Sequence, residues 1–334
     1  MSRRLAALRE RRPVSPRAHA IAAWSALFFF TVIVVTGAGV RLTGSGLGCP
    51  DWPRCNDASL TPQHGHAFIE FGNRMITTPV TIAALACLIT ALLRRPYRRD
   101  FTVLGGLLLL GVVVQAVLGG ITVLTGLNPA TVMGHFLLSM GTLFVAVLLV
   151  WRVVRERRGA RAAAEHDPRL VGAVRGLFGV GAAVVVLGTM VTASGPYAGG
   201  EGTGDDVTRL TVFGADSFKT AVMVHARIAA AFGVLAVLTW WFARRRGARD
   251  LRAPLTTVCL VVATAGVIGN LQYHELDYPA WLIWLHVSVA TLLWNALCWS
   301  VIAAGRPARE PARGRATEAA APDPAPAQLV TSDT

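Results

Sequence analysis

Apolar residues in this chain are gathered into long blocks rather than alternating with polar ones, and this feature limits the possible folds most severely. With 53% hydrophobic and only 15% charged residues, the chain is too apolar for a soluble domain. A helix needs roughly 20 residues to cross a bilayer, and eight blocks approach or reach that length. They lie near residues 20–41, 76–93, 101–124, 130–151, 170–193, 218–242, 253–273 and 280–303. The sequence therefore predicts an all-α membrane protein with eight transmembrane helices.

The net charge of +13 is distributed in a way that indicates membrane topology rather than nucleic-acid binding. Arginine clusters fall before the first apolar block, after the second, fourth and sixth blocks, and in the tail, whereas the intervening loops contain chiefly Arg54 and Arg209. Lysine and arginine are enriched in cytoplasmic loops. We therefore expect a multi-pass protein of the cell membrane, in contact with lipid, with both termini cytoplasmic and no nucleic-acid partner.

Three histidines lie inside apolar blocks, where ionisable groups are costly and usually have a partner or a function. His225 and His286 lie near the starts of their blocks, so at 1.5 Å rise per residue both imidazoles are roughly 9–10 Å below the same surface. His135 lies about 8 Å below it by the same measure. One such histidine alone is as well explained by a hydrogen bond to a neighbouring helix. Two at equal depth on two helices can hold one flat ligand between them.

The two halves of the chain resemble each other. Asn73 and His135 are 62 residues apart in the first half, and His225 and His286 are 61 residues apart in the second. We interpret this as a tandem duplication of a four-helix unit, whose copies share one orientation because four is even. The sequence thus predicts two tandem pseudo-symmetric four-helix bundles.

The predicted domains follow from these blocks and from composition. Residues 304–334 are rich in proline and alanine and lack aromatics, so we expect them to be disordered. The predicted segments are a cytoplasmic arginine-rich N-terminus (1–19), an N-terminal four-helix bundle (20–151), a cytoplasmic linker (152–169), a C-terminal four-helix bundle (170–303) and a disordered cytoplasmic tail (304–334).

The first outer loop and the start of the second block carry polar residues with a suggestive spacing. Glu70, Asn73 and Arg74 fall at i, i+3 and i+4, which places them on one helix face at the outer mouth of the block. A solvated helix start is the plain alternative. Cys49 and Cys55 lie in the oxidising outer compartment, where we expect a disulfide between them, either structural or redox-active.

The longest outer loop of the second half is the stretch 195–218, which is rich in glycine and aspartate. We expect it to form a lid over the outer mouth of the second bundle.

Paired imidazoles inside a helical bundle suit haem iron better than zinc. Zinc normally takes three or four protein ligands, whereas two histidines complete the coordination of a haem. Arg74 and Arg227, near the outer mouths, are suited to pairing with haem propionates. The first bundle offers only His135 opposite Asn73, and one axial ligand leaves an iron position open, as expected of a haem that is a substrate.

These residues lie in five stretches that together point to a known family. The stretches are TGAGVRLTGSGLGCPDWPRC (36–55), IEFGNR (69–74), VMGH ending at His135, VHAR containing His225, and WLH ending at His286. Through them the chain resembles the haem A synthase family over nearly all of residues 20–303. Members of that family oxidise the C8 methyl of haem O to a formyl group by successive hydroxylations, giving haem A for cytochrome oxidase.

The resemblance implies roles for particular residues. His225 and His286, with Arg227 nearby, would bind a haem b cofactor in the C-terminal bundle, while the N-terminal bundle takes haem O. Glu70 would be the acid needed for the chemistry, and Cys49 with Cys55 would form the outer-loop pair of the family. The implied partners are haem O synthase (protohaem farnesyltransferase) and the cytochrome oxidase assembly machinery.

This chain departs from the family at one position. Many members have a histidine where this chain has Asn73, which is a poor iron ligand. Either His135 alone holds the substrate iron, or a loop residue such as His64 or His66 supplies a second ligand; we favour the former.

Two other functions compete with this one. A di-haem electron-transfer protein of the cytochrome b type would need two symmetric ligand pairs, and Asn73 argues against it. A transporter would be expected to have polar midplane residues and broken spans, whereas the titratable groups here lie in the outer third of the blocks.

Overall fold

The computed structural model describes residues 9–49, 51–55, 62, 65–159, 165–274 and 278–308. Within these residues the chain is almost wholly helical, with eight helices long and apolar enough to cross a membrane. They are α2 (Pro16–Leu42), α3 (Gly65–Leu93), α4 (Arg99–Leu124), α5 (Pro129–Arg157), α6 (Pro168–Ser194), α7 (Ser217–Arg245), α8 (Arg249–His274) and α9 (Ala280–Ala304). The predicted class, an all-α membrane protein with eight spanning helices, is confirmed.

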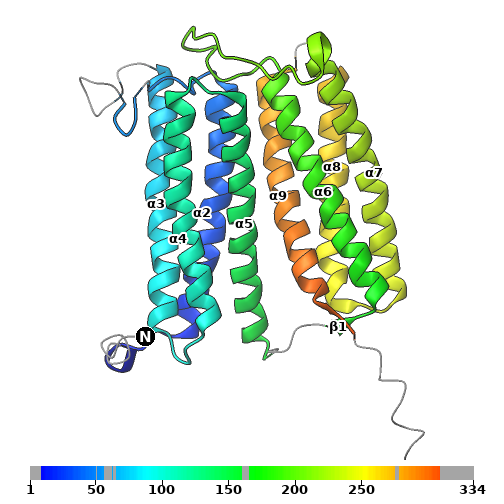
Figure 1. Cartoon of the computed structure of the whole chain (residues 1–334). Coiled ribbons are helices and arrows are strands. Elements are labelled where there is room, and N and C mark those ends of the chain that lie inside the picture. Colours follow the sequence, from blue (N-terminus) through cyan, green and yellow to red (C-terminus); the bar gives the residue numbers. More distant parts are fainter. Residues whose placement is uncertain are drawn as a thin grey trace, which may run out of the picture.

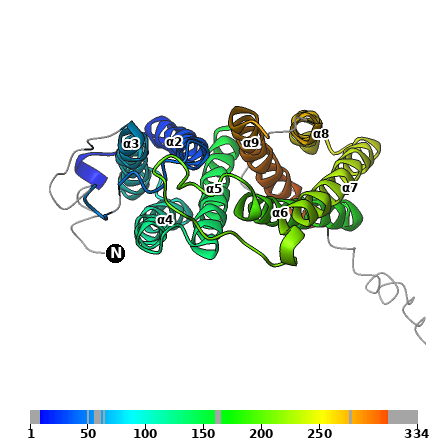
Figure 2. The same ribbon diagram turned by 90° about the horizontal axis from the view of Figure 1, so that it is seen from above.

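The helices form two groups of four that stand side by side (Figures 1 and 2). In the first group, α2 packs on α3 and α5, and α4 packs on α3 and α5; in the second, α6 packs on α7 and α9, and α8 packs on the same two helices. Helices α3 and α5 are therefore diagonal partners across the first bundle, as α7 and α9 are across the second. Origin by duplication stays a prediction.

The bundles meet through α9, which packs on α2 and α5, and through α5 against α6. Side-chain hydrogen bonds cross this boundary: Trp284 Nε1 donates to the carbonyl of Val35 (2.9 Å), and Trp294 Nε1 donates to the carbonyl of Met140 (2.9 Å). We call the end at which α2, α4, α6 and α8 finish the upper end, as drawn in Figure 1, and the opposite end the arginine-rich end.

Helix boundaries agree with the apolar blocks except at the start of α3, which begins at Gly65 rather than near residue 76. The reason is that Glu70, Asn73 and Arg74 make the first turns polar without interrupting the helix. Proline at the first position and a preceding capping side chain define other starts. The Asn128 side chain accepts a hydrogen bond from Ala130 N, and Asp167 accepts one from Arg169 N (3.0 and 2.8 Å).

The arginine-rich end contains a buried ion pair in addition to exposed positive charges. The Arg94 side chain is fully buried, and its guanidinium donates to both carboxylate oxygens of Glu156 at the end of α5 (2.9 and 2.8 Å). Topology alone does not explain this arginine. It joins the α3–α4 connection to α5.

The arginine-rich end also carries two short strands, β1 (Glu165–His166) and β2 (Arg306–Pro307), which pair in parallel. The second strand follows α9, so the chain after the last helix is tied to the segment before α6. Of the tail predicted to be disordered, only residues 304–308 belong to the part of the chain that the structure describes.

The loop between α6 and α7, which includes the 3-10 helix η1 (Gly214–Asp216), differs from our expectation of a lid over the second bundle. It crosses above α5 to reach the first bundle (Figure 2). Gly46 N donates to the carbonyl of Gly199 (2.7 Å), and Gly202 N donates to the carbonyl of Gly44 (3.1 Å). The residues on both sides of these bonds are glycines, so the two backbones approach without side chains between them.

Candidate functional site

The upper part of the second bundle brings His225 on α7 and His286 on α9 together. Their ring centroids are 6.4 Å apart and their planes are inclined by 70°. Because α7 and α9 are diagonal, the two rings meet across the interior of the bundle rather than along one side. An imidazole nitrogen is about 1.1 Å from its ring centre and binds a transition metal at about 2.0–2.1 Å, so rings in line through one metal have centres about 6.3 Å apart. The observed separation fits shared ligation of one ion.

Each ring rests against a glycine of the neighbouring helix. A Cβ added to Gly188 on α6 would lie 3.3 Å from Cε1 of His225, and one added to Gly269 on α8 would lie 3.2 Å from Cε1 of His286. Such contacts are tighter than ordinary van der Waals distances, so glycine at both positions lets the rings lie against the helices. The two glycines hold the imidazoles at their present depth.

The Nδ1 atoms of these rings are buried and make no hydrogen bond to the described residues. The imidazoles of His225 and His286 interact with the backbone of Val184 on α6 and Ala265 on α8, respectively. An imidazole with Nδ1 directed at a helix carbonyl has Nε2 free for a metal, the usual arrangement for ligating histidines. No group of three or more histidine, cysteine or acidic residues that could hold a metal ion occurs among the described residues. The opposed histidine pair fits a haem, which takes two axial ligands from the protein.

The first bundle repeats this arrangement with one substitution. His135 on α5 lies against Gly119 on α4, where an added Cβ would be 3.3 Å from Cε1, and its Nδ1 is also buried without a partner in the described chain. Asn73 on α3 lies next to Gly37 on α2, where an added Cβ would be 3.9 Å from the amide nitrogen. Thr36 Oγ1 lies 2.7 Å from Asn73 Oδ1. Asn73 thus occupies the place that His225 has in the second bundle.

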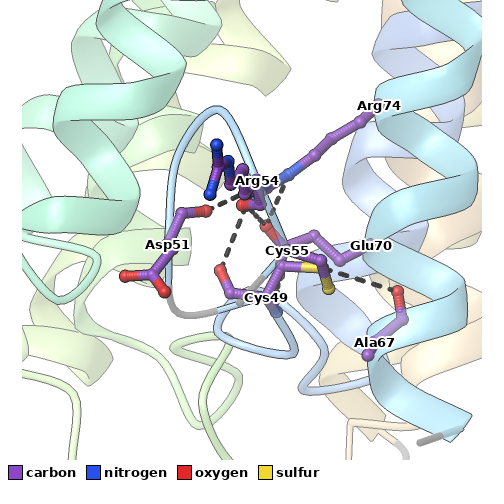
Figure 3. A network of polar contacts seen from close by, with 7 residues as sticks. All are labelled: Cys49, Asp51, Arg54, Cys55, Ala67, Glu70 and Arg74. Atoms are coloured by element: carbon purple, nitrogen blue, oxygen red, sulfur yellow. Dashed lines mark hydrogen bonds and ion pairs between the residues drawn. A yellow bond between two sulfur atoms is a disulfide. The ribbon is translucent and has the colours of Figure 1, made fainter. Parts of the chain in front are cut away.

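Glu70 and Arg74 lie beside this site but are engaged with the first outer loop (Figure 3). The Glu70 carboxylate is buried; Oε2 accepts a hydrogen bond from the backbone N–H of Cys49 (2.8 Å), and Oε1 pairs with Arg74. Arg74 also donates to the carbonyls of Cys49 (3.1 Å), Asp51 (3.0 Å) and Arg54 (3.1 Å). Because both Nε and Nη2 donate to Glu70 Oε1, these bonds use all five guanidinium N–H groups, which leaves none for a propionate in this arrangement.

The expected disulfide between Cys49 and Cys55 is present, with an S–S distance of 2.01 Å. It closes the loop that Glu70 and Arg74 hold against the start of α3. The ring of Trp52, in this loop, lies against Gly120 on α4, where an added Cβ would come within 2.7 Å of it. Gly120 neighbours the glycine that supports His135, so the loop covers the side of α4 next to that histidine.

Two predicted residues are not brought to the sites. Arg227 follows His225 by two positions, about 200° around the helix, and it is exposed with no partner within the described ranges. His66 hydrogen-bonds Ser45 Oγ through Nδ1 (2.8 Å) and lies under Gly202 of the α6–α7 loop, so it is held in the outer loops. His64 lies outside the described residues. Sequence reasoning missed Thr36 and Gly188. A signal was present, because Gly37 precedes Asn73 by nearly the same number of residues as Gly188 precedes His225.

These features define a class: an eight-helix membrane protein with an opposed histidine pair on diagonal helices of one bundle, and a single histidine and an asparagine on diagonal helices of the other. A family model described as cytochrome oxidase assembly protein matches residues 20–67 and 57–298. The chain belongs to this family, and the resemblance to the haem A synthases is confirmed.

Similar curated proteins are named heme A synthase. The one from Geobacillus kaustophilus is 34% identical over 138 residues, which are 41% of this chain and 43% of the relative. The one from Lysinibacillus sphaericus is 35% identical over 128 residues (37% and 41%), and the one from Bacillus pumilus is 31% identical over 133 residues (38% and 43%). The chain thus spans less than half the length of the curated relatives it matches.

Proposed function

We propose that this protein is a haem A synthase, an oxidoreductase that oxidises the C8 methyl of haem O, a CH group, to a formyl group by successive hydroxylations. The observation that carries the proposal is the pairing of His225 with His286 at 6.4 Å in one bundle, beside a bundle with a single histidine at the same place. A cytochrome of the electron-transfer type would need a second ligand pair, and Asn73 does not provide one.

In this proposal the C-terminal bundle holds haem b through His225 and His286. A haem bound by two histidines has no open iron position, and it supplies one-electron transfer. Gly188 and Gly269 set the depth of both rings, and the apolar helix faces around them exclude water. Arg227, two residues after His225 on α7, would supply a guanidinium to pair with a propionate of that haem.

The N-terminal bundle receives haem O as substrate, with His135 as its axial ligand. Oxidising a methyl group releases protons, and Glu70 is the acidic side chain on the same face of α3 as Asn73. We assign Glu70 the role of accepting a proton near the reacting edge of the substrate. Arg74 and the N–H of Cys49 hold its carboxylate in place. The disulfide-closed loop thereby positions the acid.

The arginine distribution supports a cytoplasmic arginine-rich end, with the sites near the outer face of the cell membrane. Both termini are then cytoplasmic. Haem O would come from haem O synthase, and haem A would pass to the cytochrome oxidase assembly machinery.

The test is haem analysis of membranes that contain haem O and this chain. Pyridine haemochrome spectra of extracted haems should show haem A with the wild type. With Glu70→Gln, which keeps the shape but not the charge, the yield should fall by about 100-fold or more, the contribution of a general base. The matched control is Glu165→Gln, an exposed carboxylate at the arginine-rich end, which should not change the yield.

The possible results separate two errors. Haem A at the normal rate from Glu70→Gln would refute the role of Glu70 alone. No haem A from the wild-type chain, with haem O present and haem b bound, would refute the proposed activity.

A further inference from the structure

The contact between Thr36 and Asn73 is one of the polar interactions that distinguish the N-terminal site from the C-terminal site. Thr36 Oγ1 lies 2.7 Å from Asn73 Oδ1, and 3.1 and 3.3 Å from the carbonyls of Val32 and Ile33 in its own helix. A hydroxyl has one proton to donate. The shortest contact is to the amide, so Thr36 donates to Asn73 and fixes the orientation of its side chain.

This bond leaves the two ends of the amide in different states. The oxygen is occupied by Thr36, whereas Nδ2, which carries two N–H groups, has no hydrogen-bond partner within the described chain. Gly37 lies beside Nδ2 and has no side chain to contact it. Even a Cβ added to Gly37 would lie 3.9 Å from Nδ2. The free end of Asn73 is therefore a hydrogen-bond donor.

The direction of that donor follows from the contacts shared by the two bundles. Gly188 and Gly269 support the two histidines that meet across the second bundle, at 6.4 Å. In the first bundle, Gly37 and Gly119 support Asn73 and His135 from the corresponding helices, again on a diagonal pair. This correspondence between the bundles, with α3 and α5 as diagonal partners, is the ground for placing Asn73 opposite His135, with a side chain that does not ligate iron.

We propose that Thr36 and Asn73 form a hydrogen-bond donor opposite His135, which keeps one side of the substrate haem open and recognises a small acceptor ligand there. The inference rests on the proposed function, because it needs a haem on His135. It assigns a positive role to the asparagine: the substrate site is held with one axial ligand, and the amide N–H groups stabilise a small anionic or dipolar ligand at the open side.

Ferric haem and azide test this in the full-length chain, purified in detergent and supplied with haem O. Azide is a small anion with acceptor atoms, and a haem held by two histidines has no free position for it. The wild type should show one azide-binding haem whose signal is lost in His135→Ala. Asn73→His should give a second low-spin haem and lose azide binding, because the open position becomes filled.

Two further variants measure the hydrogen bond. Asn73→Leu should bind azide about tenfold more weakly or worse, the effect of losing a bond to a charged group. Thr36→Val should weaken binding by about 2- to 10-fold, since the amide is kept but no longer oriented. The control is Thr81→Val, on α3 with Asn73, whose hydroxyl bonds only the carbonyl of Thr77 in its own helix; it should bind azide like the wild type.

The outcomes distinguish this inference from the proposed function. If Asn73→Leu and Thr36→Val bind azide as tightly as the wild type, the donor role is wrong. A low-spin wild-type haem at both sites would overturn the open position. If no azide-binding haem depends on His135, the placement of the substrate haem fails and the proposed function fails with it.

Discussion

At the scale of single residues, each site histidine depends on a glycine that belongs to another helix. The contacts of 3.2–3.3 Å between an added Cβ and Cε1 mean that even alanine would press on the ring, and a branched residue would displace it. Glycine in a helix costs about 1 kcal/mol relative to alanine, so these positions give up helix stability for ring placement. The ligand site therefore requires these glycines as well as the histidines.

We expect Gly269→Val to reduce the haem b retained by the purified protein. Overpacking of this kind costs about 1–3 kcal/mol, which corresponds to about 5- to 150-fold weaker retention. Gly266→Val is the control, because an added Cβ there meets nothing within 4 Å. Haem b is measured from the absorption spectrum per mole of protein. Equal haem loss from both variants would mean that helix propensity, not contact with His286, decides the result.

Arg74 is a second residue whose exact chemistry matters. Lysine has three donors where arginine has five in a planar fork, so Arg74→Lys should lose at least two of the five hydrogen bonds to Glu70 and the first outer loop, about 1–3 kcal/mol. Amide hydrogen exchange in that loop should accelerate accordingly. Arg54→Lys, an exposed position in the same loop, should leave exchange unchanged. Unchanged exchange in Arg74→Lys would show that the disulfide alone holds the loop.

At the scale of elements, the Glu201 carboxylate is one of the groups that hold the α6–α7 loop in its fold. Burial alone would raise the pKa of Glu201, but hydrogen bonds from the backbone N–H groups of Ala198 (2.5 Å) and Gly199 (2.8 Å), together with Arg209, lower it below its ordinary value. A depressed pKa in the folded state means that the carboxylate stabilises the loop above the unfolded pKa of about 4.3. The stabilisation is lost as pH falls through the lower, folded value.

Hydrogen exchange of residues 195–216 should therefore rise as pH falls below about 4.3, after correction for the intrinsic rate. Glu201→Gln should remove this pH dependence and expose the loop at neutral pH. Asp206→Asn, on an exposed residue of the same loop, should keep the wild-type profile. If Glu201→Gln retains that profile, another group controls the loop.

The ion pair between Arg94 and Glu156 differs from the loop carboxylate because the Arg94 side chain is fully buried. Arg94→Met should destabilise the protein by about 3 kcal/mol, the lower end for breaking a buried pair, because Glu156 is partly exposed. Replacing both residues by methionine should recover most of the loss, since no Glu156 carboxylate is left without its buried partner and Arg98, which also pairs with Glu156 (3.5 Å), keeps Asp100. Unfolding in detergent measures both variants, with exposed Arg157→Met as control. A double variant as unstable as Arg94→Met would contradict the argument.

At the scale of the whole molecule, the eight spans and the meeting of His225 with His286 followed from apolar blocks and helical rise. Three features did not. The start of α3 was placed about 11 residues late because polar residues mask a helix from a hydropathy argument. The α6–α7 loop reaches the first bundle through glycine backbones, and Arg74 engages loop carbonyls. Every residue type except proline carries the same backbone N–H and C=O groups, so backbone contacts between distant segments produce no recognisable sequence pattern. Sequence alone therefore does not reveal them.

The last prediction concerns the packing of the two bundles against each other. Trp294 on α9 is buried, bonds the Met140 carbonyl on α5 and stacks with Phe178 on α6 at 5.3 Å, so one indole joins both halves. Trp294→Ala should lower the free energy of unfolding by about 3–5 kcal/mol through the cavity it leaves. Trp281→Ala, on the same helix but 66% exposed, should change it by less than about 0.5 kcal/mol. Denaturant titration in detergent measures both, and equal effects would mean that the bundles are held together elsewhere along α9.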